Sequence, residues 1–328
     1  MTDLQPILEA TRHAAALCRM VQHKHIVPAL EAKSGEAVAH KQGAEPVTIA
    51  DYGAQAIVCR AISQDYPDDA VVAEEGGEQF AALISDTDQQ EIVSLISEVL
   101  GEQVTVEQVI HWLDYGQDRD AARTWVIDPI DGTKGFIQLR HYVVAVGLLN
   151  ADKQIAEGVM AAPGYADGMG AIFYTQNGAA YAEALDGGSP RQIQASQRTD
   201  PETIIAMESF EKSHASQDLM AAVREAAGIG GAHIERIDSQ EKYALVATGE
   251  ADLYLRLPRL SSTRPHMIWD HAAGVALVQA AGGIATDYDG SPLDFSLGKT
   301  LAHNKGMIVA NPRIHQQIVK AALSVVQL

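Results

Sequence analysis

The sequence predicts an α+β first lobe over residues 1–185 and an α/β second lobe over residues 186–328. Three observations lead to this fold class. The first 120 residues show mainly helical periodicity, the stretch from 142 to 184 contains short apolar runs separated by Gly, Asn and Asp, and beyond residue 190 strands and helices alternate. The lobe boundary is placed at the Leu-Asp-Gly-Gly-Ser-Pro stretch, 185–190, which has the composition of a linker.

The first lobe opens with helices. Residues 4–22 place apolar side chains on one face, and residues 51–64 repeat that pattern until Pro67 stops it. Asp51 is expected to open the second of these helices. From about 80 to 120 the apolar spacing is helical again and predicts a helical pair, inserted between a Glu-Glu turn and an Asp-Pro-Ile-Asp sequence.

Short strands supply the rest of the first lobe. Residues 68–77 predict one strand that runs into Glu74 and a glycine turn. Later in the lobe, four apolar runs separated by turn residues predict an antiparallel meander, at 142–149, 155–161, 171–174 and 179–184.

Strands and helices alternate in the second lobe, which is typical of an α/β arrangement. Strands are expected at 204–207, 233–237, 253–257, 284–286 and 307–310, and helices at 216–227, 239–249 and 270–281. A last helix is expected to begin with Asn311 as its N-cap and Pro312 as its first helical residue.

Composition and charge narrow the class of protein. The chain has 328 residues, of which 47% are hydrophobic, so a sizeable core can form. With a formal net charge of −19, the protein lacks the basic surface of a duplex nucleic-acid binder. A small anion could still bind where metal ions or a basic pocket offset the carboxylates. Cys18 and Cys59 form no C-x-x-C pattern, which argues against a disulfide framework or a structural zinc site.

The expected location is the cytoplasm. The chain does not begin with a basic stretch followed by an apolar segment, and no apolar run reaches the roughly 18–20 residues of a membrane span. No membrane partner is therefore expected.

The chemistry is expected to centre on residues 125–136, which are Trp-Val-Ile-Asp-Pro-Ile-Asp-Gly-Thr-Lys-Gly-Phe. A short buried strand should end at Asp128, because Pro129 cannot continue the hydrogen-bond ladder and turns the chain. Asp131 follows, and Gly132 permits a close approach of the backbone. Two carboxylates with a carbonyl between them suit Mg²⁺, although an Asp/Gly turn that caps a helix explains the same residues more simply.

Three further acids stand beside turn signals: Asp51, Glu74 and Asp270. Each taken singly is more often a helix N-cap or first-turn acid than a metal ligand. Together with the central pair, they are acids at strand-to-helix junctions spread along the whole chain. That arrangement indicates a site for two or more Mg²⁺ ions about 3.5–4 Å apart.

Three motifs of the sequence together resemble those of a known family. The run WVIDPIDGTKGF, with VVAEEGGE before it and IWDHAAG after it, is similar to the Mg²⁺-dependent, lithium-sensitive phosphatases of the inositol monophosphatase superfamily. Lys-Gly-Phe after Asp-Gly-Thr resembles the 3′(2′),5′-bisphosphate nucleotidases, whereas inositol monophosphatases typically have Asn-Phe a little further on. The likeness extends from about residue 40 to 285, and it implies a layered αβαβα, sugar-phosphatase-like architecture.

The resemblance also implies roles for individual residues. Asp51 and Thr133 would activate the water that attacks phosphorus, and the backbone amides of Gly132 and Thr133 would face the phosphate oxygens. The ligands of two or three Mg²⁺ ions would be Glu74, Asp128, the Ile130 carbonyl, Asp131 and Asp270.

Four residues of the second lobe match family positions that bind the adenosine 5′-phosphate part of the substrate: His214, Ser239, Lys242 and Arg256. A solvated surface charge is the simpler explanation for a lone basic residue, but Arg256 lies within an apolar strand and needs a partner. At the first position the family has His-Ser-Ser-His, whereas here His214 is followed by Ala-Ser-Gln, which leaves the adenine and ribose contacts open.

The predicted function is hydrolysis of the 3′-phosphate of adenosine 3′,5′-bisphosphate to AMP and phosphate, and the resemblance extends it to 3′-phosphoadenosine 5′-phosphosulfate. Two alternatives remain, a phosphatase for inositol (poly)phosphates and a non-catalytic module that binds nucleotide or metal. The expected partner is a phosphorylated small molecule and not nucleic acid, and the chain is expected to be a monomer or a weak oligomer.

Overall fold

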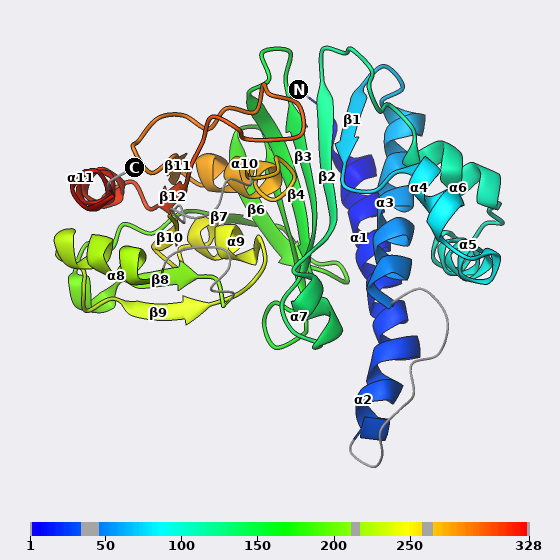
Figure 1. Cartoon of the computed structure of the whole chain (residues 1–328), viewed down its shortest axis with the longest axis horizontal. Coiled ribbons are helices and arrows are strands. Elements are labelled where there is room, and N and C mark those ends of the chain that lie inside the picture. Colours follow the sequence, from blue (N-terminus) through cyan, green and yellow to red (C-terminus); the bar gives the residue numbers. More distant parts are fainter. Residues whose placement is uncertain (1, 34–45, 211–216, 258–264, 327–328) are drawn as a thin grey trace.

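Two β-sheets alternate with three layers of helices, which is the αβαβα arrangement that the resemblance implied (Figure 1). The structure is a computed structural model that describes residues 2–33, 46–210, 217–257 and 265–326. Three apolar clusters fill the space between the layers, as expected when each sheet and helix buries one hydrophobic face against a neighbour.

Within the described residues the first sheet has seven strands in sequential order. They are β1 (Ala70–Ala73), β2 (Thr124–Asp131), β3 (Val143–Leu149), β4 (Ile155–Ala162), β5 (Ala171–Gln176), β6 (Ala179–Ala184) and β7 (Arg191–Ile193). β1 pairs with β2 in parallel and the later neighbours pair antiparallel, which confirms the meander. Because β7 follows the 185–190 stretch, this sheet continues past the lobe boundary that we predict.

β2 runs through the whole acidic motif, whereas the sequence predicted a strand that ends at Asp128. Its pairing with β3 changes register between Asp128 and Asp131, and Asp131 again faces a strand partner, Val143. Pro129 has no N–H to donate, and the irregular pairing accommodates it without ending the strand. The prediction that the chain turns at Pro129 is therefore wrong.

Long helices cover the outer face of the first sheet (Figure 1). They are α1 (Gln5–Val21), which continues through a π-helical turn η1 (Gln22–Ile26) into α2 (Val27–Lys33), and α3 (Pro46–Asp65). The expectation that Asp51 opens its helix is wrong, because α3 already begins at Pro46 and Asp51 lies more than a turn inside it. Proline suits the first turn of a helix, where its missing N–H would have no helical partner.

The inserted helical segment contains three helices, α4 (Gly77–Leu83), α5 (Asp86–Leu100) and α6 (Val106–Leu113), and not the predicted pair. Ser85 caps α5, and Thr105 forms a capping box with Gln108 at the start of α6. Gly101 ends α5 with a positive φ of 67°, a conformation that favours glycine. No helix in the described parts of the chain is long and apolar enough to cross a membrane.

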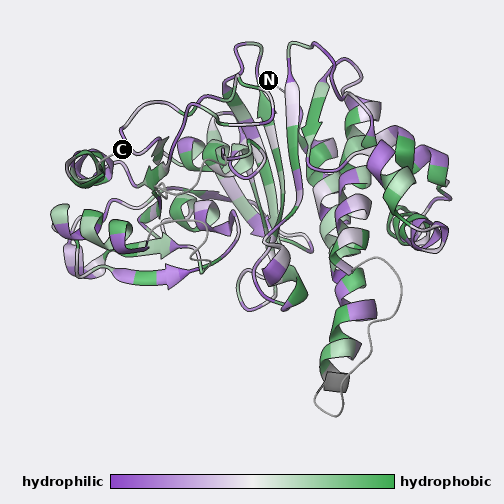
Figure 2. Cartoon of the chain, viewed as in Figure 1, coloured by the Kyte–Doolittle hydropathy of each residue, from purple (hydrophilic) through white to green (hydrophobic). Residues whose placement is uncertain are grey.

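The second sheet has five strands among the described residues, in the order β11-β12-β10-β8-β9. Two helices, α8 (Gln217–Ala226) and α11 (His315–Val325), lie on the outside of this sheet. Figure 2 shows hydrophilic and hydrophobic residues on both, as expected for helices that cover one face of a sheet. The strands are β8 (Ile205–Glu208), β9 (His233–Arg236), β10 (Leu253–Arg256), β11 (Ile284–Thr286) and β12 (Met307–Ala310). The helices α9 (Glu241–Ala247) and α10 (Ala272–Ala280) lie between the two sheets. A short 3₁₀ turn, η2 (Pro201–Thr203), precedes β8.

Two glycines bring α10 against the first sheet. Gly147 of β3 and Gly158 of β4 are paired with each other across the two strands. A Cβ atom added to Gly147 would lie 2.8 Å from the Cβ of Ala272, and one added to Gly158 would lie 2.7 Å from the carbonyl oxygen of Ala273. Any larger residue would push α10 away, so this contact fixes how closely the start of α10 approaches the sheet.

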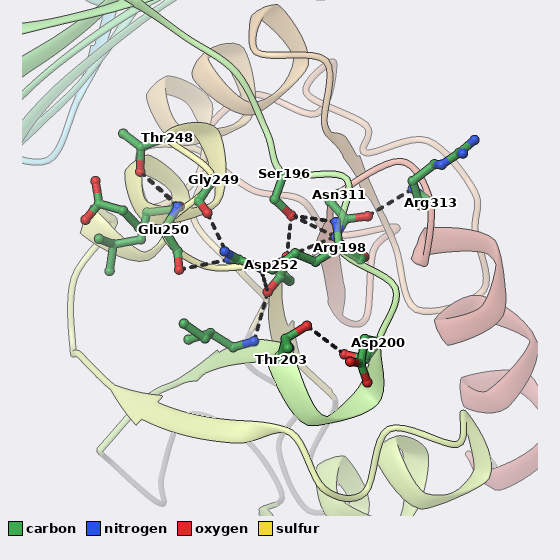
Figure 3. Close-up of polar contacts among 12 residues, drawn as sticks. Ser196, Arg198, Asp200, Thr203, Thr248, Gly249, Glu250, Asp252, Asn311 and Arg313 are labelled. Atoms are coloured by element: carbon green, nitrogen blue, oxygen red, sulfur yellow. Dashed lines mark hydrogen bonds and ion pairs between the residues drawn. The ribbon is translucent and has the colours of Figure 1, made fainter.

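A fully buried carboxylate, Asp252, ties the second sheet to the segments around it (Figure 3). Arg198 Nε donates to its two oxygens at 3.0 and 2.9 Å, and the Ile205 N–H donates at 2.9 Å. Asn311 Nδ2 donates to the same carboxylate at 3.1 Å. Asn311 is therefore a buried anchor and not the predicted N-cap, since α11 begins only at His315.

We predict that Asp252→Ala lowers the free energy of unfolding by about 3 kcal/mol, because the substitution leaves Arg198 and the neighbouring donors without their acceptor. The value is at the low end for a broken buried ion pair, since Arg198 keeps some contact with solvent. Urea unfolding at fixed pH measures it. The control is Asp200→Ala, an exposed cap of η2 that should cost about 1 kcal/mol. Equal losses in the two variants would contradict the anchoring role of Asp252.

Candidate active site

The acidic motif ends in a tight turn between the two lobes. Gly132 has a φ of +100° and begins α7 (Thr133–Ile137). A Cβ atom at this position would lie 2.9 Å from the carbonyl oxygen of Asp238 and 3.1 Å from that of His141. Glycine is thus required both by the backbone conformation and by the close approach of the second lobe. This contact places Asp131 beside the start of α9.

The two carboxylates of the motif have different surroundings. Asp128 is 3% exposed, and its Oδ1 has no hydrogen-bond partner among the described residues. Asp131 Oδ2 accepts a hydrogen bond from the backbone N–H of Gln240 at 2.9 Å. A buried carboxylate oxygen without a donor is costly, and a bound cation is one way to satisfy it. Asp128 is therefore the strongest single indication of a metal ligand.

Glu74 follows β1, and a glutamine holds the peptide next to it. Gln55, fully buried in α3, donates from Nε2 to the carbonyl oxygen of Glu75 at 2.7 Å and accepts from the Glu75 N–H at 2.9 Å. These two bonds fix the Glu74–Glu75 turn against the helix that carries Asp51. Gln55 was not among the predicted site residues, although its position four residues after Asp51 places it on the same helical face.

Repulsion between carboxylates shows that the acidic residues share one region. Burial raises the pKa of Asp128 well above its usual range, and the charges of Asp131 and Glu74 raise it further. Burial and the charge of Asp131 raise the pKa of Asp270 to about 7. The pKa of Glu74 is also raised to about 7, by burial and by nearby carboxylates. Because the Glu74 side chain keeps access to solvent, we attribute its shift mainly to the repulsion.

Asp51 also interacts electrostatically with these carboxylates. Burial, followed by the charges of Glu74 and Glu75, raises the pKa of Asp51 well above that of a free aspartate. α3, which carries Asp51, contacts α7, which begins with the exposed Thr133. The helices are therefore neighbours, while the pairing of these two side chains stays a prediction.

The donor chemistry of these residues fits Mg²⁺. All the predicted ligands offer oxygen, and their repulsion needs a compensating positive charge. As the side chains stand, no three His, Cys, Asp or Glu residues in the described parts of the chain are grouped closely enough to hold an ion. The site therefore has the right chemistry without a closed ligand set, and the assignment of Glu74, Asp128, Ile130, Asp131 and Asp270 as ligands stays a prediction.

A cavity of about 110 Å³ joins the acidic motif to the second lobe. It brings together five of the predicted site residues, Asp131, Ser239, Lys242, Arg256 and Asp270, and Asp238 lies beside them. His214 is outside the described residues. The structure thus places three carboxylates, Asp131, Asp238 and Asp270, and both predicted cations around a common space.

The two cations in this cavity differ in how they are held. Lys242 is buried, and its Nζ donates to the carbonyl oxygens of Ile237 at 2.6 Å and Ser239 at 2.7 Å. Burial lowers its pKa to about 8. Arg256 Nε is buried without a hydrogen-bond partner among the described residues. Arg256 is therefore the better candidate to meet an anion, whereas Lys242 also supports the loop that precedes α9.

The chain belongs to the inositol monophosphatase family, whose model matches residues 3–327. Members of this family are Mg²⁺-dependent phosphatases. The match covers both lobes, so it includes every residue that the sequence analysis assigned to the site.

Curated relatives have similar length and are named as nucleotidases. A 3′(2′),5′-bisphosphate nucleotidase of Oryza sativa is 32% identical over 344 residues, covering 97% of this chain and 93% of its own length. The protein of the same name from Emericella nidulans is 34% identical over 323 residues, covering 88% and 90%. A 3′(2′),5′-bisphosphate nucleotidase 1 of Candida albicans is 32% identical over 316 residues, covering 87% and 86%.

Solved structures share the fold. An IMPase of Thermotoga maritima matches with a TM-score of 0.61 at 21% identity, covering 97% of this chain and 95% of the other. An inositol monophosphatase from Anabaena matches with a TM-score of 0.58 at 21% identity, covering 100% and 99%. These likenesses support the layered architecture predicted above.

We predict that Mg²⁺ binding at pH 7 releases protons and that the affinity falls as the pH drops from 8 to 6. Carboxyl groups with a pKa of about 7, Glu74 and Asp270, are half protonated at neutral pH and must ionise to bind a cation. Calorimetric titration in buffers of different ionisation enthalpy counts the protons. Release of fewer protons is expected for Asp270→Asn, and a pH-independent affinity in the unsubstituted protein would contradict the shared site.

Proposed function

We propose that this chain is a Mg²⁺-dependent phosphatase that hydrolyses the 3′-phosphate of adenosine 3′,5′-bisphosphate to AMP and phosphate. We further propose that it accepts 3′-phosphoadenosine 5′-phosphosulfate as a second substrate and uses two or three Mg²⁺ ions. The names of the curated relatives support the nucleotide substrate.

One observation carries the proposal. The 110 Å³ cavity is lined by the carboxylates Asp131 and Asp270 and by Arg256, whose Nε is buried without a hydrogen-bond partner among the described residues. A substrate with two phosphates suits such a space, because one phosphate can face the metal ligands while a second meets Arg256. A monophosphate held by the metal ligands would leave the buried Nε of Arg256 without a hydrogen-bond acceptor.

The chain's own residues would prepare the reaction. Asp51, whose pKa is raised by burial and nearby acids, would hold a proton from the attacking water, with Thr133 as its partner. Gln55 would keep the Glu74–Glu75 turn in place, and Gln240 would orient Asp131 through its backbone N–H. When bound, Mg²⁺ supplies Lewis-acid polarisation of the phosphate and neutralises the carboxylates.

We predict much higher kcat/KM for adenosine 3′,5′-bisphosphate than for inositol 1-phosphate or inositol 1,4-bisphosphate, and no turnover without Mg²⁺. Phosphate release from the three compounds, with and without added Mg²⁺, measures this directly. Preference for an inositol compound would replace the proposal with the inositol-phosphatase alternative. Absence of release from all three would favour the non-catalytic module.

We predict that Asp51→Asn lowers kcat by about 10²–10⁴-fold while the dissociation constant for the nucleotide changes little, because the amide cannot accept a proton. Asp65→Asn is the matched control, since Asp65 is exposed at the end of the same helix and should leave kcat unchanged. Turnover of Asp51→Asn at the level of the control would remove Asp51 from the mechanism.

A further inference from the structure

A second cavity, of about 180 Å³, adjoins the first and carries cations. Its lining includes Lys134, Gln138, Arg140, His141, Phe210 and Asp238. Asp238 borders both cavities, and Ser209 lines the first while the next residue, Phe210, lines the second. The two cavities therefore adjoin each other at Asp238 and along the Ser209–Phe210 segment.

The first cavity is small for a substrate that carries a third anionic group. Sites for small molecules usually have volumes of roughly 300–1,000 Å³. The cavities here have about 110 and 180 Å³, so neither alone reaches that range. A group attached beyond the phosphate that meets Arg256 would extend past Asp238 into the second cavity.

The charges of the second cavity suit an anion. Lys134, Arg140 and His141 line this cavity together with one carboxylate, Asp238, in a protein whose net charge is −19. The guanidinium of Arg140 is exposed and has no hydrogen bond or ion pair with any described residue. The Nδ1 of His141 lies 2.9 Å from Oε1 of Glu241, which is buried. The hydrogen bond to Glu241 raises the pKa of His141, so the charged imidazolium is favoured.

The backbone beneath these cations is held by close packing. A Cβ atom on Gly135 would lie 1.9 Å from the carbonyl oxygen of His141, and one on Gly164 would lie 2.5 Å from that of Arg140. The N–H of Arg140 also donates to the carbonyl of Gly135 at 2.8 Å. The backbone of the segment that carries both cations is therefore packed closely against two glycines. This packing restricts its conformation and pre-organises it for binding.

We propose that Arg140 and His141 form a subsite for the sulfo group of 3′-phosphoadenosine 5′-phosphosulfate, next to the phosphate that Arg256 would hold. This inference rests on the proposed function. The sulfo group is attached to the 5′-phosphate through a bridging oxygen, and beyond a phosphate held by Arg256 it would enter the adjoining cavity. Only the 3′-phosphate ester is hydrolysed, and the bond between sulfur and the bridging oxygen is unchanged.

The test compares phosphate release from 3′-phosphoadenosine 5′-phosphosulfate and from adenosine 3′,5′-bisphosphate. Arg140→Gln should raise KM for the sulfated substrate about tenfold, because a charge-assisted hydrogen bond is lost, and should change KM for the bisphosphate less than twofold. Arg140→Lys should recover part of the loss. The matched control is Arg313→Gln, whose side chain is exposed in another part of the second lobe and should alter neither KM (Figure 3).

The outcomes separate the two proposals. Equal changes for both substrates, or no change for the sulfated one, would overturn the subsite while the phosphatase activity on nucleotides stands. Failure of the unsubstituted protein to release phosphate from either nucleotide would overturn the proposed function and the subsite together.

Discussion

The close approach of α10 to the first sheet is the constraint on which the candidate site depends. Gly147 and Gly158 lie side by side on β3 and β4, and together they leave room for the backbone and small side chains at the start of α10. Asp270 stands immediately before that helix. Asp270 thereby reaches the region where β2 ends in Asp131, and the two carboxylates line one cavity.

This packing has an electrostatic cost, and the cost indicates the function. Buried carboxylates raise each other's pKa, and Asp128 has an oxygen that no described residue satisfies. A fold maintained only for stability would gain nothing from this arrangement. It becomes favourable when divalent cations bind, and the cations in turn attract a phosphate. Arg256 lines the same cavity as these acids, and Arg140 and His141 line the adjoining one, where they would meet the further anionic groups of the proposed substrate.

Local patterns in the sequence were sufficient for most of the elements, and five of the site residues that the resemblance implied line one cavity. Alternating and helical periodicities are local, so they predicted the meander and the second lobe. The start of α3, the course of β2 through Pro129 and the buried role of Asn311 depend on tertiary contacts, and local patterns misjudged them. Gln55 and the paired glycines went unnoticed for the same reason, because their partners are distant in the sequence. The number of inserted helices could have been read from the caps at Ser85 and Thr105.

The central claim is that acids from both lobes hold divalent cations at one site. The most direct measurement is anomalous X-ray diffraction from crystals grown with Mn²⁺, which takes oxygen ligands as Mg²⁺ does. Our account predicts anomalous peaks within coordination distance of Asp128, Asp131 and Asp270, together with Glu74. Peaks confined to the protein surface, or ions bound by the carboxylates of one lobe alone, would contradict it.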